Sequence, residues 1–275
     1  MIRTKLSTRI ILLIILCIYF VIIIIPFLMM FLNSFKSMRD IFLHPFSLPS
    51  TWSFSNYINA WEKANLGAAY LNSIIITISS IAGILLVSSM LAYVLSRYNF
   101  KFRRFIYIYI ILGLALPARL AIIPIYVLLG NLNLTDTRIG LIIVYIATGI
   151  SFATFMLKGF MDRVPLAIEE SARIDGASPL KIYWKIALPL CKPGLVVIGL
   201  VNFVNVFNDF FFPLIIISSR SKETVPLAIS IFFGEFSNRW DLIAAALSSA
   251  VIPIMIIFFM FSKWFISGIT EGAIK

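Results

Sequence analysis

Six long apolar stretches constrain the fold of this chain more than any other feature. They cover residues 10–32, 70–95, 105–129, 139–160, 194–217 and 242–266. One helix needs about 20 apolar residues to cross the hydrocarbon core of a bilayer. Within lipid, a single segment of this length satisfies its own backbone hydrogen bonds only as a helix. The sequence therefore predicts an all-α polytopic membrane protein with one membrane domain, residues 1–275, and six transmembrane helices.

The distribution of lysine and arginine predicts how these helices are oriented. With the amino terminus inside, the inside segments are 1–9, 96–104, 158–193 and the tail from Lys263, and they hold 15 of the 23 Lys and Arg residues. Cationic loops are retained in the cytoplasm. Both termini are therefore expected on the cytoplasmic side of the membrane. The net charge of +11 is then explained by topology and the lipid surface, and no nucleic-acid partner is expected.

The residues that carry most enzyme chemistry are scarce. His44 is the only histidine, and Cys17 and Cys191 lie in different segments, so no zinc site is expected. The spans contain no nucleophile–base pair and no metal-binding constellation. No phosphate-binding Gly-x-x-x-x-Gly-Lys-Ser/Thr loop occurs either. We therefore expect neither an enzyme nor a chain that binds a nucleotide or a metal ion by itself.

The inside segment 161–193 is longer than a turn between two spans requires. Pro165 suits the first position of a short helix, and Gly176 suits the left-handed residue after its end. Ser178 is placed to cap a second helix, which Pro189 is expected to stop.

Within the first of these helices, Glu169 and Arg173 are one turn apart, a spacing that allows them to pair. By periodicity alone, the favoured interpretation of the whole segment is an amphipathic loop on the inner leaflet.

One motif in this segment favours a more specific interpretation. The residues Glu170-Ser171-Ala172, then Gly176, then Ile186-Ala187-Leu188-Pro189 resemble the signature of ATP-binding-cassette importer permeases, Glu-Ala-Ala, three residues, Gly, nine residues, Ile-x-Leu-Pro. Only Ser171 departs from it. The resemblance implies the type I importer permease fold and a coupling helix that docks in a cleft of a separate ATPase subunit. It assigns this coupling role to Glu170, Ser171, Ala172, Asp175, Gly176, Ile186, Leu188 and Pro189.

Three further stretches resemble the shorter permease of the pair in the carbohydrate (maltose-type) branch of these importers. They are Phe46-Ser-Leu-Pro-Ser with Asn56-Tyr-Ile-Asn-Ala-Trp61, then Asn208-Asp209-Phe-Phe-Phe-Pro213-Leu, and the ending 268–275. The resemblance implies import of a sugar by alternating access. It also implies a second permease subunit, two ATPase subunits that bind ATP and Mg, and an extracytoplasmic solute-binding protein. The alternatives are a permease for a non-sugar solute in the same class, or a secondary transporter, which would need internal repeats and a coupling-ion site.

Polar residues inside the spans are candidates for a substrate pathway. Asn202, Asn205 and Asp209 are spaced three and four residues apart, so they would share one helix face. Such groups usually face the interior of a bundle, and their donors and acceptors suit a hydroxyl-rich ligand. Hydrogen bonding between helices is the alternative role. Arg119 is predicted at a similar depth to Asp209, and we expect the two to pair or to flank the pathway.

The remaining expectations concern two local features. Gly113, Pro117 and Pro124 predict local unwinding of the third span. The apolar stretch 225–233 is too short to span, so a re-entrant or partly buried segment is expected there. By the resemblance, Gly234 and Glu235 would lie near its tip and contact the binding protein; interfacial packing is the alternative.

Overall fold

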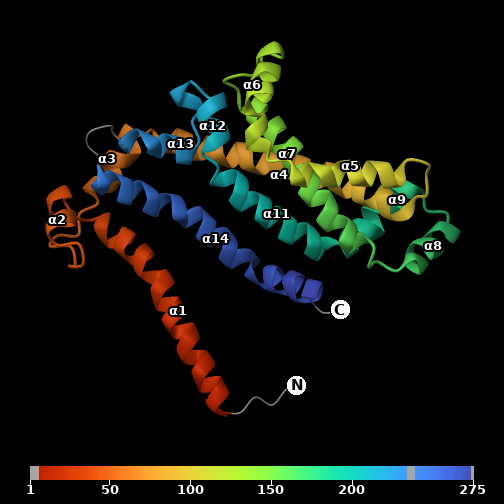
Figure 1. The fold of residues 1–275 in the computed structure, drawn as a ribbon, viewed down its shortest axis with the longest axis horizontal. Helices are drawn as coiled ribbons and strands as arrows, with labels where there is room; N and C mark the ends of the chain where they lie inside the picture. Colours follow the sequence, from red (N-terminus) through yellow and green to blue (C-terminus); the bar gives the residue numbers. More distant parts are fainter. Residues whose placement is uncertain (1–5, 234–238, 274–275) are drawn as a thin grey trace. The chain divides into compact units, whose positions relative to one another are not determined.

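The computed structural model describes residues 6–233 and 239–273, with side chains described as far as residue 260. The described residues are mostly helical, with turns and short loops between the helices, and they form no β-strand, which confirms the predicted all-α class. Along the chain the elements are α1 (Leu6–Asn33), α2 (Met38–Leu43), α3 (Ser55–Lys63), α4 (Leu66–Arg97), α5 (Arg103–Ala115), η1 (Ala118–Ala121), α6 (Ile122–Asn131), α7 (Arg138–Met161), α8 (Leu166–Ile174), α9 (Pro179–Ile182), η2 (Tyr183–Ala187), α10 (Leu188–Leu190), α11 (Lys192–Phe207), α12 (Phe211–Ile216), η3 (Arg220–Lys222), α13 (Val225–Ile229), η4 (Ser230–Phe232) and α14 (Trp240–Ala273) (Figure 1).

Four helices in the described residues are long and apolar enough to cross a membrane singly: Thr8–Asn33, Leu66–Arg97, Arg138–Met161 and Trp240–Met260. They correspond in sequence to the first, second, fourth and sixth predicted stretches. The two other candidates are bent helix pairs, which bring the number of possible spans to six.

The third predicted span is broken in the middle. Helix α5 ends at Ala115, and the chain turns through 87° before it continues as η1 and α6. Leu116 precedes Pro117 and takes an extended conformation, with φ −89° and ψ 115°, as expected for a residue whose helical conformation is disfavoured by the following proline ring. The interruption predicted from the prolines is therefore present.

The fifth predicted span, 194–217, is not one continuous helix. Helix α11 ends at Phe207, and α12 begins only at Phe211. At 16 residues, α11 is about 24 Å long, shorter than the hydrocarbon core. In the gap, the Asp209 carboxylate accepts a hydrogen bond from the Phe212 backbone N–H at 3.1 Å. Such side-chain bonds compete with the helical ladder, which explains why hydropathy alone misplaced this boundary.

The chain divides into two compact units. The first comprises the residues up to Leu66 together with Ile229–Ile252. Its buried centre includes Phe35, whose ring packs against Trp52 and Tyr57 with centroids 5.1 and 5.4 Å apart. The apolar side chains of α1, by contrast, are exposed along most of the helix.

The second unit, Gly67–Ala228 with the chain from Pro253, carries the candidate functional residues. Its helices α4, α7 and α11 pack closely: a methyl group added at Gly149 would lie only 2.6 Å from Ile84 Cδ1. Within this unit, α8 and α9 lie at one end of α4 and α7, and α6 and α12 lie at the other (Figure 1). One apolar cluster that includes Tyr93, Met161 and Tyr183 lies toward the α8 end.

Candidate functional site

Helix α8 has the boundaries that its sequence predicts, with one small difference. Pro165 is the residue before the first turn instead of the first helical residue. At the other end, Gly176 has φ +79°, the left-handed conformation that glycine adopts without strain. The Gly176 N–H bonds to the Arg173 carbonyl and the Ala177 N–H to the Ala172 carbonyl, at 3.1 and 3.0 Å. These bonds satisfy carbonyl groups that the helix end would otherwise leave unpaired.

The second short helix begins as predicted but does not stop where predicted. The Ser178 hydroxyl accepts a hydrogen bond from the Lys181 N–H, so Ser178 caps α9. The helix then passes through a π-helical turn, η2, and continues beyond Pro189 to Leu190. In that turn the Leu188 N–H bonds to the Tyr183 carbonyl, five residues back. A π-helical turn therefore accommodates a proline that would stop a regular α-helix, and the break comes at Cys191.

Glu169 makes a different ion pair from the one that its helix position predicts. Its Oε1 lies 2.7 Å from Nε of Arg97, at the end of α4, and its Oε2 accepts a hydrogen bond from the Tyr93 hydroxyl at 3.2 Å. The Arg97 and Glu169 side chains are only 5% and 3% exposed. The pair with Arg173 that the helical spacing allows is not the one formed, because Glu169 lies on the buried face of α8, whereas Arg173 is exposed.

Arg97 also contacts the chain that leads from α7 into α8. Its Nη2 donates to the Met161 and Val164 carbonyls at 2.9 and 3.1 Å. A buried ion pair is stable only when its remaining donors and acceptors are satisfied. Here the hydrogen bonds to carbonyls and to Tyr93 do this, and they fix α8 to α4 and to the end of α7.

The opposite face of α8 is exposed. Of the residues assigned to coupling, Glu170, Ser171, Asp175, Gly176 and Pro189 are exposed, and Ala172, Ile186 and Leu188 are half-buried.

The same face carries Ile174, whose side chain is 87% exposed. Neither Ile174 nor Arg97 was found by sequence reasoning; the exposed last turn of an amphipathic helix was the only signal for Ile174.

A polar cluster around Asp209 lies at the other end of this unit. The Asp209 carboxylate accepts a hydrogen bond from the Tyr145 hydroxyl at 2.9 Å and lies 3.5 Å from Arg119 Nη2. The predicted pairing of Arg119 with Asp209 is therefore present. The Asp209 side chain is 8% exposed and that of Arg119 is 69% exposed, and the Arg119 guanidinium also lies over the Phe211 ring at 5.5 Å.

The two asparagines of the predicted polar face do not share an environment with Asp209. Asn202 is buried, and its Nδ2 donates to the Ile198 carbonyl of its own helix at 2.9 Å. Asn205 is exposed. Asp209 lies beyond the end of α11, so the helical spacing that would align the three residues does not extend to it.

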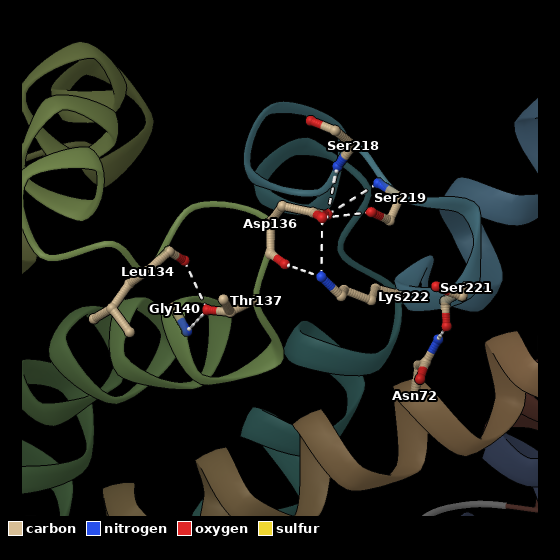
Figure 2. Close-up of polar contacts among 9 residues, drawn as sticks. All are labelled: Asn72, Leu134, Asp136, Thr137, Gly140, Ser218, Ser219, Ser221 and Lys222. Carbon is tan, nitrogen blue, oxygen red and sulfur yellow. Dashed lines mark hydrogen bonds and ion pairs between the residues drawn. The ribbon is translucent and has the colours of Figure 1, made fainter.

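A second polar cluster, which the sequence analysis did not find, centres on Asp136 in the turn between α6 and α7 (Figure 2). One carboxylate oxygen accepts the Ser218 and Ser219 N–H groups at 3.0 and 2.9 Å. The other oxygen accepts the Ser219 hydroxyl and the Lys222 ammonium. The side-chain hydrogen bonds from Ser219 and Lys222 hold the pKa of the Asp136 carboxyl well below its usual range.

The segment that contacts Asp136 is also hydrogen-bonded to α4. The Asn72 Nδ2 donates to the Ser221 and Glu223 carbonyls, each at 2.9 Å, and the Ser73 hydroxyl accepts the Val225 N–H at 2.9 Å. Figure 2 shows Asn72 reaching Ser221 from the α4 ribbon. Residues 218–225 are therefore held from two sides, by α4 and by the α6–α7 turn.

The apolar stretch 225–233 forms α13 and η4, and Val225, Leu227 and Ala228 are buried, in agreement with a partly buried segment. Gly234 and Glu235 lie outside the described residues. Within the described part of the chain, no group of three His, Cys, Asp or Glu side chains is placed to hold a metal ion.

These features define a class: a multi-pass helical membrane protein with broken spans and an exposed pair of short helices, α8 and α9, between its fourth and fifth spans. The chain belongs to the family of binding-protein-dependent transport system inner membrane components, whose family model matches residues 84–271.

Two relatives cover nearly the whole chain. The chain is 33% identical over 253 residues to the diacetylchitobiose uptake system permease protein NgcG of Streptomyces coelicolor, over 91% of this chain and 84% of that protein. It is also 33% identical over 250 residues to the probable starch degradation products transport system permease protein AmyC of Thermoanaerobacterium thermosulfurigenes, over 91% of each.

A solved structure confirms the predicted importer permease fold. In the crystal structure of a bacterial ABC transporter involved in the import of the acidic polysaccharide alginate, one chain matches with a TM-score of 0.85 and 23% identity. The match covers 95% of this chain and 99% of that chain.

Proposed function

We propose that this chain is the permease subunit of an ATP-driven, binding-protein-dependent importer for an oligosaccharide or a related sugar. The observation that carries this proposal is its likeness, over nine-tenths of its length, to the NgcG and AmyC permeases of diacetylchitobiose and starch-product transport. The candidate pathway residues Asn202, Asn205 and Asp209 are chemically suited to such a substrate, because amide and carboxylate groups offer hydrogen bonds to hydroxyl groups.

The exposed face of α8 is the proposed docking surface for an ATPase subunit. Glu170, Asp175 and Ile174 project from a short helix that is held to the rest of the unit on its other face. The chain lacks a phosphate-binding loop, so ATP and Mg would be bound by two partner ATPase subunits, which would also hydrolyse the ATP.

A second permease subunit is the proposed neighbour of two incompletely buried features. The first is the apolar surface of α1, which is exposed along most of the helix. The second is Arg119, a charged and largely exposed side chain inside a predicted span. Although Arg119 is paired with Asp209, its side chain is still 69% exposed, and an exposed charge at this depth needs a water-lined cavity or a further polar neighbour. Arg119, Asp209 and the exposed Asn205 would therefore line a pathway between the two permeases, with the buried Asn202 supporting it.

The proposed topology follows the charge distribution, with both termini in the cytoplasm and the Asp136 cluster on the outer side of the bacterial cytoplasmic membrane. A solute-binding protein would dock on that outer side, near Gly234 and Glu235. ATP binding would close the ATPase dimer, α8 would move with it, and the pathway would open outward, receive the sugar and reset after hydrolysis.

The test is reconstitution of the chain with its partner subunits in liposomes, with uptake of labelled malto- and chito-oligosaccharides as the readout. The proposal expects uptake that requires both ATP and the binding protein, and loss of that uptake in Glu170→Lys. Uptake without the ATPase subunits, or unchanged uptake in Glu170→Lys with the ATPase attached, would contradict it.

A further inference from the structure

Polar contacts connect each end of helix α4 to another segment. Tyr93 and Arg97 bond to Glu169 of α8 at one end, and Asn72 and Ser73 bond to residues 218–225 at the other; each group of contacts is called a joint. We propose that Arg97, Tyr93 and Glu169 carry the movement of α8 to α4, and that Asn72 and Ser73 carry the movement of α4 on to residues 218–225. Arg97 and Asn72 would then be positioning residues for transport. This inference rests on the proposed function, in which α8 moves with an ATPase subunit.

At the α8 end, both Glu169 oxygens accept hydrogen bonds and two of the three Arg97 nitrogens donate them. Both oxygens of Glu169 are bonded, one to Arg97 and one to Tyr93. Arg97 in addition binds the Met161 and Val164 carbonyls. Because the pair is almost fully buried, separating it would leave an uncompensated charge in an apolar region. Movement of α8 away from α4 is therefore costly, and the two helices are expected to move together.

Between its two joints, α4 is suited to transmit movement over a long distance. It contains 32 residues and no proline, and the part from Asn72 to Arg97 corresponds to about 37 Å of continuous helix. Proline is a frequent cause of sharp helix kinks. By contrast, the third and fifth predicted spans of the same unit are both interrupted.

The joint at the opposite end connects α4 to a segment that is also fixed elsewhere. Asn72 and Ser73 bind the backbone at Ser221, Glu223 and Val225. Asp136 binds the same segment from the α6–α7 turn (Figure 2). Because Arg97 also binds the Met161 and Val164 carbonyls at the end of α7, α4 and α7 are expected to move together with α8, and residues 218–225, which are bonded to α4 and to the α6–α7 turn, are expected to move with them. A displacement of α8 would therefore also displace residues 218–225.

The experiment uses the complete importer with its partner subunits in lipid nanodiscs. Ser221→Cys supplies a labelling site at an exposed position whose backbone carbonyl still binds Asn72. Its reaction rate with a charged maleimide is measured with and without a non-hydrolysable ATP analogue, and the chain without this cysteine gives the background. We expect the nucleotide to change this rate.

Two matched variants then test the joint. Glu169→Gln removes the carboxylate from the buried pair. The change in the maleimide reaction rate caused by the nucleotide should become about tenfold smaller, because a buried charged hydrogen bond is lost. Asp162→Asn makes the same chemical change in the exposed Lys158–Asp162 pair of the same segment, and it should respond like the parent. Tyr93→Phe, which removes only one hydroxyl, should show a smaller loss, and it serves if Glu169→Gln fails to fold.

Co-purification of the ATPase subunits separates transmission from docking and from general instability. The proposal expects the ATPase to remain attached in Glu169→Gln. Detachment of the ATPase, an unchanged nucleotide response in that variant, or no nucleotide response in the parent would each overturn the proposal. Sugar uptake by the parent is measured in parallel, so a failure of the proposed function is distinguished from a failure of this joint.

Discussion

Gly176 ends α8 at the edge of the proposed docking surface, and replacing it with alanine tests the local geometry without changing any contact. A methyl group added there meets nothing within 4 Å, so the whole effect comes from the backbone. At φ +79° a residue with a Cβ is destabilised by about 1–2 kcal/mol. This free energy corresponds to about a 5- to 30-fold change in a local opening equilibrium.

The assay is hydrogen exchange of the amides in the last turn of α8, with the permease in its complete complex. Gly176→Ala should accelerate their exchange by about 5- to 30-fold. Gly159→Ala is the matched control, because Gly159 lies within α7 and an added methyl group there also meets nothing within 4 Å. In a helix interior, alanine is as good as glycine or better by up to about 1 kcal/mol. Equal exchange in the Gly176→Ala variant and the parent would refute the reasoning.

Three further substitutions test the buried polar contacts. Arg97→Met should destabilise the unit by about 3–5 kcal/mol, since it leaves Glu169 buried without a partner, and a thermal shift no larger than that of a surface variant would contradict this. Tyr145→Phe removes one hydrogen bond to Asp209 and should cost about 1.5–3 kcal/mol, measured by thermal unfolding in detergent; an unchanged midpoint would show that the bond is not formed. Hydrogen bonds hold the pKa of Asp136 below its usual range. Ionised Asp136 therefore stabilises residues 218–222 fully above the usual carboxyl pKa of about 4, and this stabilisation is lost as the pH falls below that value toward the lowered pKa. Acid-accelerated hydrogen exchange in the segment after α12, corrected for intrinsic rates, should therefore be absent in Asp136→Asn, and an identical pH profile in the two proteins would refute it.

The features predicted correctly from the sequence depend on local constraints. Lipid requires long apolar helices, so four of the six spans could be located by hydropathy alone. Gly176 and Ser178 were assigned correctly because a left-handed helix end and an N-cap each depend on the backbone of a few neighbouring residues.

The features that the sequence did not reveal depend on contacts between distant residues. Glu169 pairs with a residue 72 positions away, whereas the helical spacing rule considers only neighbours such as Arg173. The Asp136–Lys222 contact joins residues 86 positions apart, and no local pattern marks it. The break after Phe207 was missed for a different reason: apolar residues continue through it, and the Asp209 carboxylate accepts the Phe212 N–H, which a continuous helix would bond to the Asn208 carbonyl.

The most direct test of the central claim, that α8 receives force from a separate ATPase, is a cross-linking measurement on the complete complex. Ile174→Cys places a thiol at the most exposed apolar position of α8, and Phe46→Cys provides an exposed control predicted on the other side of the membrane. With a short bifunctional thiol reagent and ATPase subunits carrying surface cysteines, Ile174→Cys should form a permease–ATPase adduct and Phe46→Cys should not. An adduct from Phe46→Cys alone, or none from Ile174→Cys in a complex that transports sugar, would contradict the account.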